Sequence, residues 1–163
     1  MTKLKRWALM NKVFIIALLL MAVFAYMDFK QVTTIRNIES FDDEQKWNEY
    51  WEHQQPATVV MWSAVIISIG IIWYLFKKDK SEAIALAVTP LILLFTGVQD
   101  VIYFAFEGSM PATLAWADVI TSVRVISDAL GETVPTSTSF TLSALLGVVV
   151  SYFVYKRLQK AKW

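Results

Sequence analysis

The residues best placed to do chemistry lie within residues 96–107, a stretch that is otherwise apolar. Thr96, Asp100, Tyr103 and Glu107 recur at helical spacing, so a single helix would carry all four side chains on one face. Asp100 would then lie about 9 Å inside the outer end of a membrane span, at about 1.5 Å per residue. An ionisable side chain at that depth is costly to bury and indicates a functional site.

Two interpretations of Asp100 stay open. In the first, it lines a polar pocket open to the outside and acts as a proton acceptor, a cation site or a metal ligand, with Gln99 and Tyr103 orienting it. In the second, it is a structural carboxylate that is hydrogen-bonded to a neighbouring helix and paired with Arg124. The sequence assigns no catalytic residue. The candidate ligand or ion site consists of Thr96, Gln99, Asp100, Tyr103, Glu107 and Arg124.

The single histidine gives a weak metal candidate. His53 lies four residues after Glu49, a spacing that lets a carboxylate and an imidazole share a metal ion on one helix face. Helical di-iron sites need two Glu-x-x-His pairs and further carboxylates, which one histidine cannot supply. We therefore expect Glu49 and His53 to lie on a solvated helix face, and the sequence indicates no metal and no particular cofactor.

Composition excludes several classes of chemistry. The chain has no cysteine, which rules out thiolate nucleophiles and Cys-ligated zinc or iron–sulfur clusters as intrinsic chemistry. Ser137, Ser139 and Ser143 have no Gly-x-Ser-x-Gly setting, and no phosphate loop or dinucleotide fingerprint is present. The net charge of +1 gives no reason to expect nucleic acid as a partner.

The elements that must position these residues are membrane-spanning helices. The chain of 163 residues is 56% hydrophobic, and its apolar residues fall in long blocks separated by charges. A hydrocarbon core of about 30 Å needs about 20 helical residues to cross it. We therefore predict an all-α integral membrane protein, a single four-helix bundle with two external amphipathic helices. Its spans are expected at about 8–29, 57–76, 83–106 and 133–155, with a kink at Pro90.

The polar segment 28–55 is expected outside the membrane. Ser40, followed by acidic residues, predicts the start of a short helix over about 41–54 that Pro56 ends. Three aromatic side chains share one face of this helix beside the second span, and that position suits the level of the lipid headgroups. They are Trp47, Tyr50 and Trp51.

The second external segment is 107–132. Apolar residues recur at helical spacing over 109–131, and Gly131 is a natural helix stop. Asp118, Arg124 and Asp128 give this stretch too many charges for a simple span. We expect an amphipathic helix that either lies on the membrane or is tucked against the bundle.

The distribution of basic residues predicts the orientation. If the N-terminus is cytoplasmic, the cytoplasmic segments hold 11 of the 15 basic residues, and the positive-inside rule favours that orientation with both termini inside, most simply at the plasma membrane. An alternative for the first apolar block is a cleavable signal peptide with Val23-Phe24-Ala25 at its end. The apolar run continues past Ala25, which favours a retained anchor. The 11 residues are Lys3, Lys5, Arg6, Lys12, Lys77, Lys78, Lys80, Lys156, Arg157, Lys160 and Lys162.

Three functions stay open. The shortage of reactive groups favours a non-catalytic accessory or structural subunit of a larger membrane complex. A small membrane enzyme or lipid-ligand binder would use a polar site around Asp100 near the outer face. A transporter or channel protomer would place Asp100 in a pathway across an oligomer, although the sequence has no internal repeat. The expected partners are the lipid bilayer and other membrane subunits or further copies of this chain.

Overall fold

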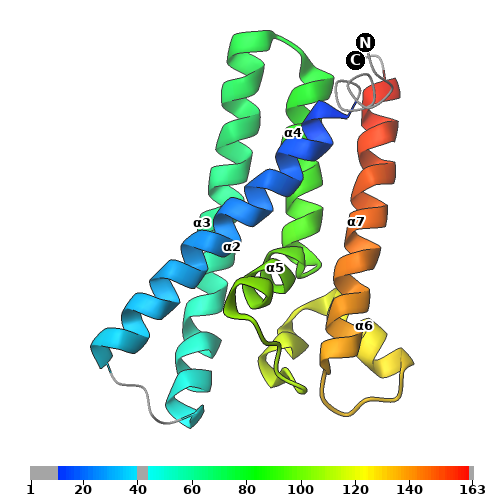
Figure 1. Ribbon diagram of the computed structural model, residues 1–163. Helices are drawn as coiled ribbons and strands as arrows, with labels where there is room; N and C mark the ends of the chain where they lie inside the picture. The colour runs from blue at the N-terminus through cyan, green and yellow to red at the C-terminus, as the bar shows by residue number, and fades with distance from the viewer. Residues whose placement is uncertain (1–10, 40–43, 162–163) are drawn as a thin grey trace.

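A computed structural model describes the backbone of residues 11–39 and 44–161, and the side chains of these residues except 35–56, 115 and 119 (Figure 1). This part of the chain is helical, apart from turns and one isolated bridge between Thr113 and Thr136. The helices are α2 (Lys12–Glu39), α3 (Glu44–Lys77), α4 (Lys80–Phe95), α5 (Val98–Glu107), the short 3-10 helix η1 (Ala115–Val119), α6 (Thr121–Ala129) and α7 (Ser137–Lys160).

The long helices lie side by side in a bundle. Helices α2, α3 and α7 run along most of its length, and α4 extends from the α3–α4 connection to about the middle (Figure 1). Helices α5, η1 and α6 gather toward the end at which α7 begins. The start of α2, the α3–α4 connection and the end of α7 lie together at the opposite end. The N-terminal and C-terminal ends of the described chain therefore lie on the same side of the bundle.

Three helices are long and apolar enough to cross a membrane, through Lys12–Thr34, Ala57–Lys77 and Ser137–Lys160. A fourth crossing results if α4 and α5, which meet at an angle of 61°, are one broken span. The structure thus confirms the coarse prediction of an all-helical protein with three or four helices of membrane-spanning character.

The boundaries of the first two long helices differ from those predicted. Helix α2 does not end near residue 29 but runs on to Glu39, and α3 passes through Pro56 without a break. The predicted short helix over 41–54 is therefore not a separate element. A proline inside a helix removes one hydrogen bond and crowds the carbonyl group four residues earlier, but the long helical arms on both sides of Pro56 keep the helix continuous.

The break in the predicted third span lies after Pro90 and not at it. Pro90 lies inside the continuous helix α4, and the chain breaks later, at Thr96 and Gly97. Gly97 has a φ of +79°, a left-handed conformation that glycine adopts without strain. Helix α7 approaches this point closely, because a Cβ atom added to Gly147 would lie 1.8 Å from Thr96 Oγ1.

Serine hydroxyls bind the carbonyl groups that the break leaves free. Ser143 Oγ of α7 donates to the Thr96 carbonyl over 3.1 Å and lies 2.9 Å from Ser122 Oγ of α6. Ser122 Oγ in turn donates to the Phe95 carbonyl over 3.2 Å. The last carbonyls of a helix have no partner within it, so these bonds explain how the bend is maintained inside the bundle.

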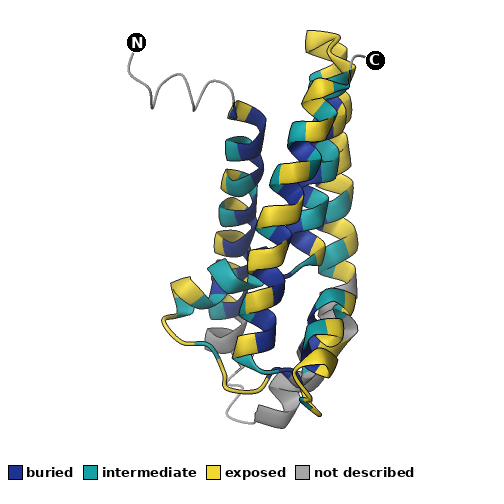
Figure 2. Ribbon diagram, turned by 90° about the vertical axis from the view of Figure 1, so that its right-hand side faces the viewer, coloured by how far each residue is buried: buried dark blue, intermediate teal, exposed yellow. Residues whose placement is uncertain are grey.

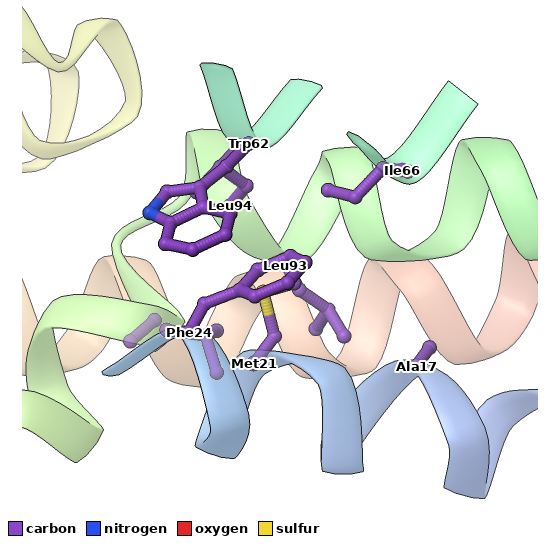
Figure 3. Close-up of a cluster of buried hydrophobic side chains, with 9 residues drawn as sticks. Ala17, Met21, Phe24, Trp62, Ile66, Leu93 and Leu94 are labelled. Carbon is purple, nitrogen blue, oxygen red and sulfur yellow. The ribbon is translucent and has the colours of Figure 1, made fainter. Parts of the chain in front are cut away.

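The main core lies where α2, α3 and α4 meet. Side chains from the three helices converge there, and the Phe24 and Trp62 rings stack with centroids 4.1 Å apart (Figure 3). The outward sides of the helices carry exposed residues, whereas buried residues line the inward sides (Figure 2). Many of the exposed side chains are large and apolar, as the lipid-facing surface of a membrane protein requires.

The stretch predicted as one amphipathic helix over 109–131 forms two short pieces, η1 and α6, separated at Ile120. The predicted stop is confirmed, since α6 ends at Ala129 and Gly131 has a φ of +73°. Apolar side chains of this region pack on Phe140 of α7, and the arrangement is therefore the one tucked against the bundle. The packed residues are Leu114, Ala117 and Val123.

A buried polar cluster beside the helix break

A carboxylate inside the bundle is the centre of the candidate site. Asp28 of α2 is only 8% exposed, and both of its carboxylate oxygens accept from Trp62 Nε1 of α3 at 3.3 Å. Its Oδ2 atom also accepts from Gln99 Nε2 of α5. One carboxylate therefore joins three helices. We call Asp28, Trp62, Gln99 and Asp100 the polar cluster.

Gln99 supplies one donor to Asp28 and carries an acceptor that has no partner among the described residues. Its side chain is 3% exposed, and its Oε1 atom is buried without a hydrogen-bond partner among the described residues. The sequence predicted that Gln99 orients Asp100, whereas the structure places its amide against Asp28. A buried carbonyl oxygen without a donor costs free energy, so this atom is the least satisfied part of the cluster.

Asp100 lies next to Gln99 in the first turn of α5 and is partly buried. The residue that precedes this helix is Gly97, which has no side chain to cap the free N–H groups. A carboxylate in the first turn is stabilised by the positive end of the helix dipole. Asp100 also lies close enough to Asp28 for the two carboxylates to repel each other electrostatically.

No basic side chain in the described part of the chain neutralises this pair. The predicted partner Arg124 lies 3.7 Å from Asp118 instead, and these two side chains are 61% and 53% exposed. Asp118 lies on the neighbouring helical piece, so Arg124 finds an acid in solvent without entering the bundle. The prediction of an Asp100–Arg124 pair is therefore wrong, and the polar cluster carries two acids without a cation.

Of the other predicted site residues, Tyr103 and Glu107 share helix α5 with Asp100, whereas Thr96 does not. Thr96 lies on the far side of the break, where its hydroxyl donates to the Ile92 carbonyl, so it does not share a helix face with Asp100. Tyr103 is buried in α5, where its ring packs edge-on to Phe29. Glu107 is the last residue of α5.

The two weak metal candidates cannot be placed in the same detail. Glu49 and His53 belong to α3, and their side chains fall outside the described residues. The same holds for Trp47 and Trp51, which were expected at the headgroup level. Among the described residues, no three His, Cys, Asp or Glu side chains gather as a metal-binding group.

Asp28 is the site residue that the sequence prediction missed, because it was assigned to an external segment. The spacing of apolar residues before and after Asp28 already indicated that the first helix continues past it. Phe24, Ala25, Asp28 and Val32 lie on one face of a helix, and all four are buried. A search for apolar periodicity on both sides of Asp28 would have extended the first helix and placed the acid inside.

The arrangement can hold a positively charged or hydrogen-donating group by oxygen atoms alone. It offers two carboxylates and one free amide oxygen, with an indole N–H that fixes one carboxylate. It contains no thiol and no imidazole. Comparison with models of protein families, with curated proteins and with solved structures found no match for this chain, so its site is interpreted from its own chemistry.

Proposed function

We propose that the protein is a multi-pass membrane protein that binds a small cation within the membrane, as the protomer of a transporter or channel. The observation that carries this proposal is the buried Asp28 carboxylate, which is fixed by two hydrogen-bond donors but has no basic partner among the described side chains. Charged groups inside a membrane are expensive, and those that occur there commonly serve ion or proton pathways.

The broken span beside the polar cluster supports a transport role. Helices α4 and α5 meet at 61°, and both Gln99 and Asp100 lie in the first turn after the break. In secondary transporters, discontinuous helices bring helix ends and polar backbone to the ion site in the same way. The broken span counts as one of four crossings in this proposal.

The orientation proposed for the four spans has both ends of the chain in the cytoplasm. The described basic residues of the predicted cytoplasmic set lie where α2 starts, α3 passes to α4 and α7 ends, which we call the basic end (Figure 1). The positive-inside rule supports placing this end in the cytoplasm, with the polar cluster nearer the outer face. These residues are Lys12, Lys77, Lys78, Lys80, Lys156, Arg157 and Lys160.

Ion flux through reconstituted protein tests the proposal. Liposomes that contain the protein and an internal dye for protons, sodium or calcium are exposed to a gradient of each ion. We expect a flux of at least one of these cations that Asp28→Asn abolishes, because the amide keeps the size of the side chain but not its charge. Asp128→Asn is the matched control, since Asp128 is exposed on α6. Absence of any flux that depends on Asp28 contradicts the proposal.

A second candidate function, an accessory subunit of a membrane complex, is favoured by α3. Only 17% of its apolar window is buried, compared with 39% for α2 and 33% for α7. A partner helix or lipid must cover the remainder. Photo-crosslinkable amino acids placed at Ile67, Ile71 and Leu75, which are exposed on α3, show whether a partner protein or lipid covers this helix. A single protein adduct at all three positions supports a subunit, whereas adducts only with lipid contradict it.

A further inference from the structure

We infer that the ligand of the polar cluster is a divalent cation of the calcium class, bound by the Asp28 and Asp100 carboxylates and by Gln99 Oε1. This inference rests on the proposed function and names its ion. The size of the ligand follows from packing. Asp28, Trp62 and Gln99 are all buried, and Trp62 is stacked on Phe24 in the core. Burial of all three side chains favours a single ion over an organic molecule as the ligand.

The chemistry of the donors selects the kind of ion. Carboxylate and amide oxygens are hard ligands, which calcium and magnesium prefer and which soft transition metals do not. Calcium accepts flexible geometry and carboxylates that bind through both oxygens, whereas magnesium demands a near-ideal octahedron and retains several waters. A site with two carboxylates inside a packed bundle therefore suits calcium better than magnesium.

Gln99 is the independent observation that points to a ligand here. Its amide is fixed inside the polar cluster by Asp28, yet its Oε1 atom is buried and receives no hydrogen bond from the described residues. Rotation of this amide by half a turn exchanges Nε2 for Oε1 and turns the carbonyl oxygen toward the two carboxylates. A cation between them would then satisfy this oxygen, for which the described residues offer no donor.

The charge of the polar cluster selects a divalent ion over a monovalent one. Asp28 and Asp100 repel each other, and the described ion pairs, Lys12–Glu82 and Arg124–Asp118, do not involve them. Two carboxylates together carry a charge of about −2 when ionised. One divalent ion neutralises both of them, whereas a sodium ion leaves one negative charge in a medium of low dielectric constant.

Trp62 makes the inference directly measurable. Terbium binds calcium sites and emits when a nearby tryptophan absorbs light and transfers its energy over a short distance. Trp62 Nε1 lies 3.3 Å from the Asp28 carboxylate, so an ion on that carboxylate lies beside the indole. Protein in lipid nanodiscs, freed of metal by a chelator, is titrated with terbium under tryptophan excitation, and calcium is then added as a competitor.

We expect sensitised emission that calcium displaces. Asp28→Asn and Asp100→Asn should each weaken terbium binding by about 10- to 100-fold, since even outer-shell partners of a metal contribute that much. Gln99→Leu should weaken it to a smaller extent, because it removes a neutral ligand. Asp128→Asn should bind as the unaltered protein does. Circular dichroism and gel filtration of every variant show whether its fold is intact.

A tryptophan control excludes the acidic segment that precedes the second apolar block. Trp47 and Trp51 lie in sequence among acids that can attract terbium on their own. Emission from the polar cluster should be lost in Trp62→Phe and retained when Trp47 and Trp51 are both replaced by phenylalanine. The reverse result places the ion at the acidic segment and overturns the inference.

Two further outcomes separate this inference from the proposed function. If terbium and calcium do not bind, but a proton or sodium flux still depends on Asp28, the inference is wrong and the proposed function stands. If neither divalent binding nor any flux depends on Asp28, both are wrong. Terbium emission that Asp28→Asn leaves unchanged, in a folded variant, also overturns the inference.

Discussion

The same kind of contact occurs at two levels of the bundle, where a tryptophan N–H donates to a carboxylate on another helix. At the basic end, Trp73 Nε1 of α3 donates to Glu82 Oε2 of α4 over 3.1 Å, and Lys12 of α2 forms an ion pair with the same carboxylate. In the polar cluster, Trp62 Nε1 donates to Asp28, and no lysine or arginine of the described residues completes the arrangement.

The difference is that the described residues supply Glu82 with a basic partner and do not supply one to Asp28. Glu82 has an indole donor and a cation from its own protein, so it needs nothing further to join α2, α3 and α4. Asp28 has an indole and an amide donor but no basic partner among the described side chains, and Asp100 adds a second carboxyl group nearby. A buried carboxylate without a basic partner is destabilising, and either a proton or a bound cation can neutralise it. The proposed calcium ion would supply that charge.

The largest expected loss of stability comes from replacing the tryptophans, Trp62 and Trp73. Trp62→Ala should destabilise the protein by about 3–5 kcal/mol, because it empties a fully packed core position. Trp73→Ala should cost less, since Trp73 is only partly buried. Thermal unfolding in the same detergent compares them. Equal losses would show that the two tryptophan–carboxylate pairs contribute alike.

Neutralising Asp28 and neutralising Glu82 should change the stability of the protein in opposite directions when divalent ions are absent. Glu82→Gln leaves Lys12 without its partner and should cost about 0.5–1 kcal/mol, a modest value because the lysine is partly in solvent. Asp28→Asn removes an uncompensated buried charge and should raise the unfolding temperature. A loss of stability in both variants would make Asp28 a structural carboxylate like Glu82.

The sequence predicted the long helices well because their apolar runs are long and carry few charges. It also identified Asp100, since an acid within an apolar span stands out without any knowledge of its neighbours. It did not identify the polar cluster, because the contact between Gln99 and Asp28 joins residues 71 positions apart. It expected a bend at Pro90 and not the break at Thr96 and Gly97, where Gly147 lets α7 approach closely.

The smallest expected effect concerns a third carboxylate, which lies outside the proposed spans. Hydrogen bonds lower the pKa of Glu132 below its ordinary value, chiefly the bond from the Thr136 hydroxyl, which caps α7. A lowered pKa in the folded state stabilises the protein at pH values above the ordinary one, near 4.3 for glutamate in peptides. This contribution is lost as the pH falls through the folded pKa.

Glu132→Gln therefore should flatten the acid side of the stability profile slightly and change nothing at the polar cluster. Unfolding temperatures of the variant and the unaltered protein, measured between neutral pH and about pH 3, give the difference between the two profiles. Profiles that stay parallel over this range would show that the Thr136 bond does not depend on the charge of Glu132.

Calcium-dependent unfolding tests the contrast between Asp28 and Glu82 most directly. The unaltered protein, Asp28→Asn and Glu82→Gln are melted in nanodiscs with a chelator and again with calcium in excess. A ligand present at about 100 times its dissociation constant adds about 2.7 kcal/mol to the folded state. We predict that calcium raises the unfolding temperature of the unaltered protein and of Glu82→Gln by the same amount and leaves that of Asp28→Asn unchanged. An equal calcium response in all three proteins, or none in the unaltered protein, would contradict the account.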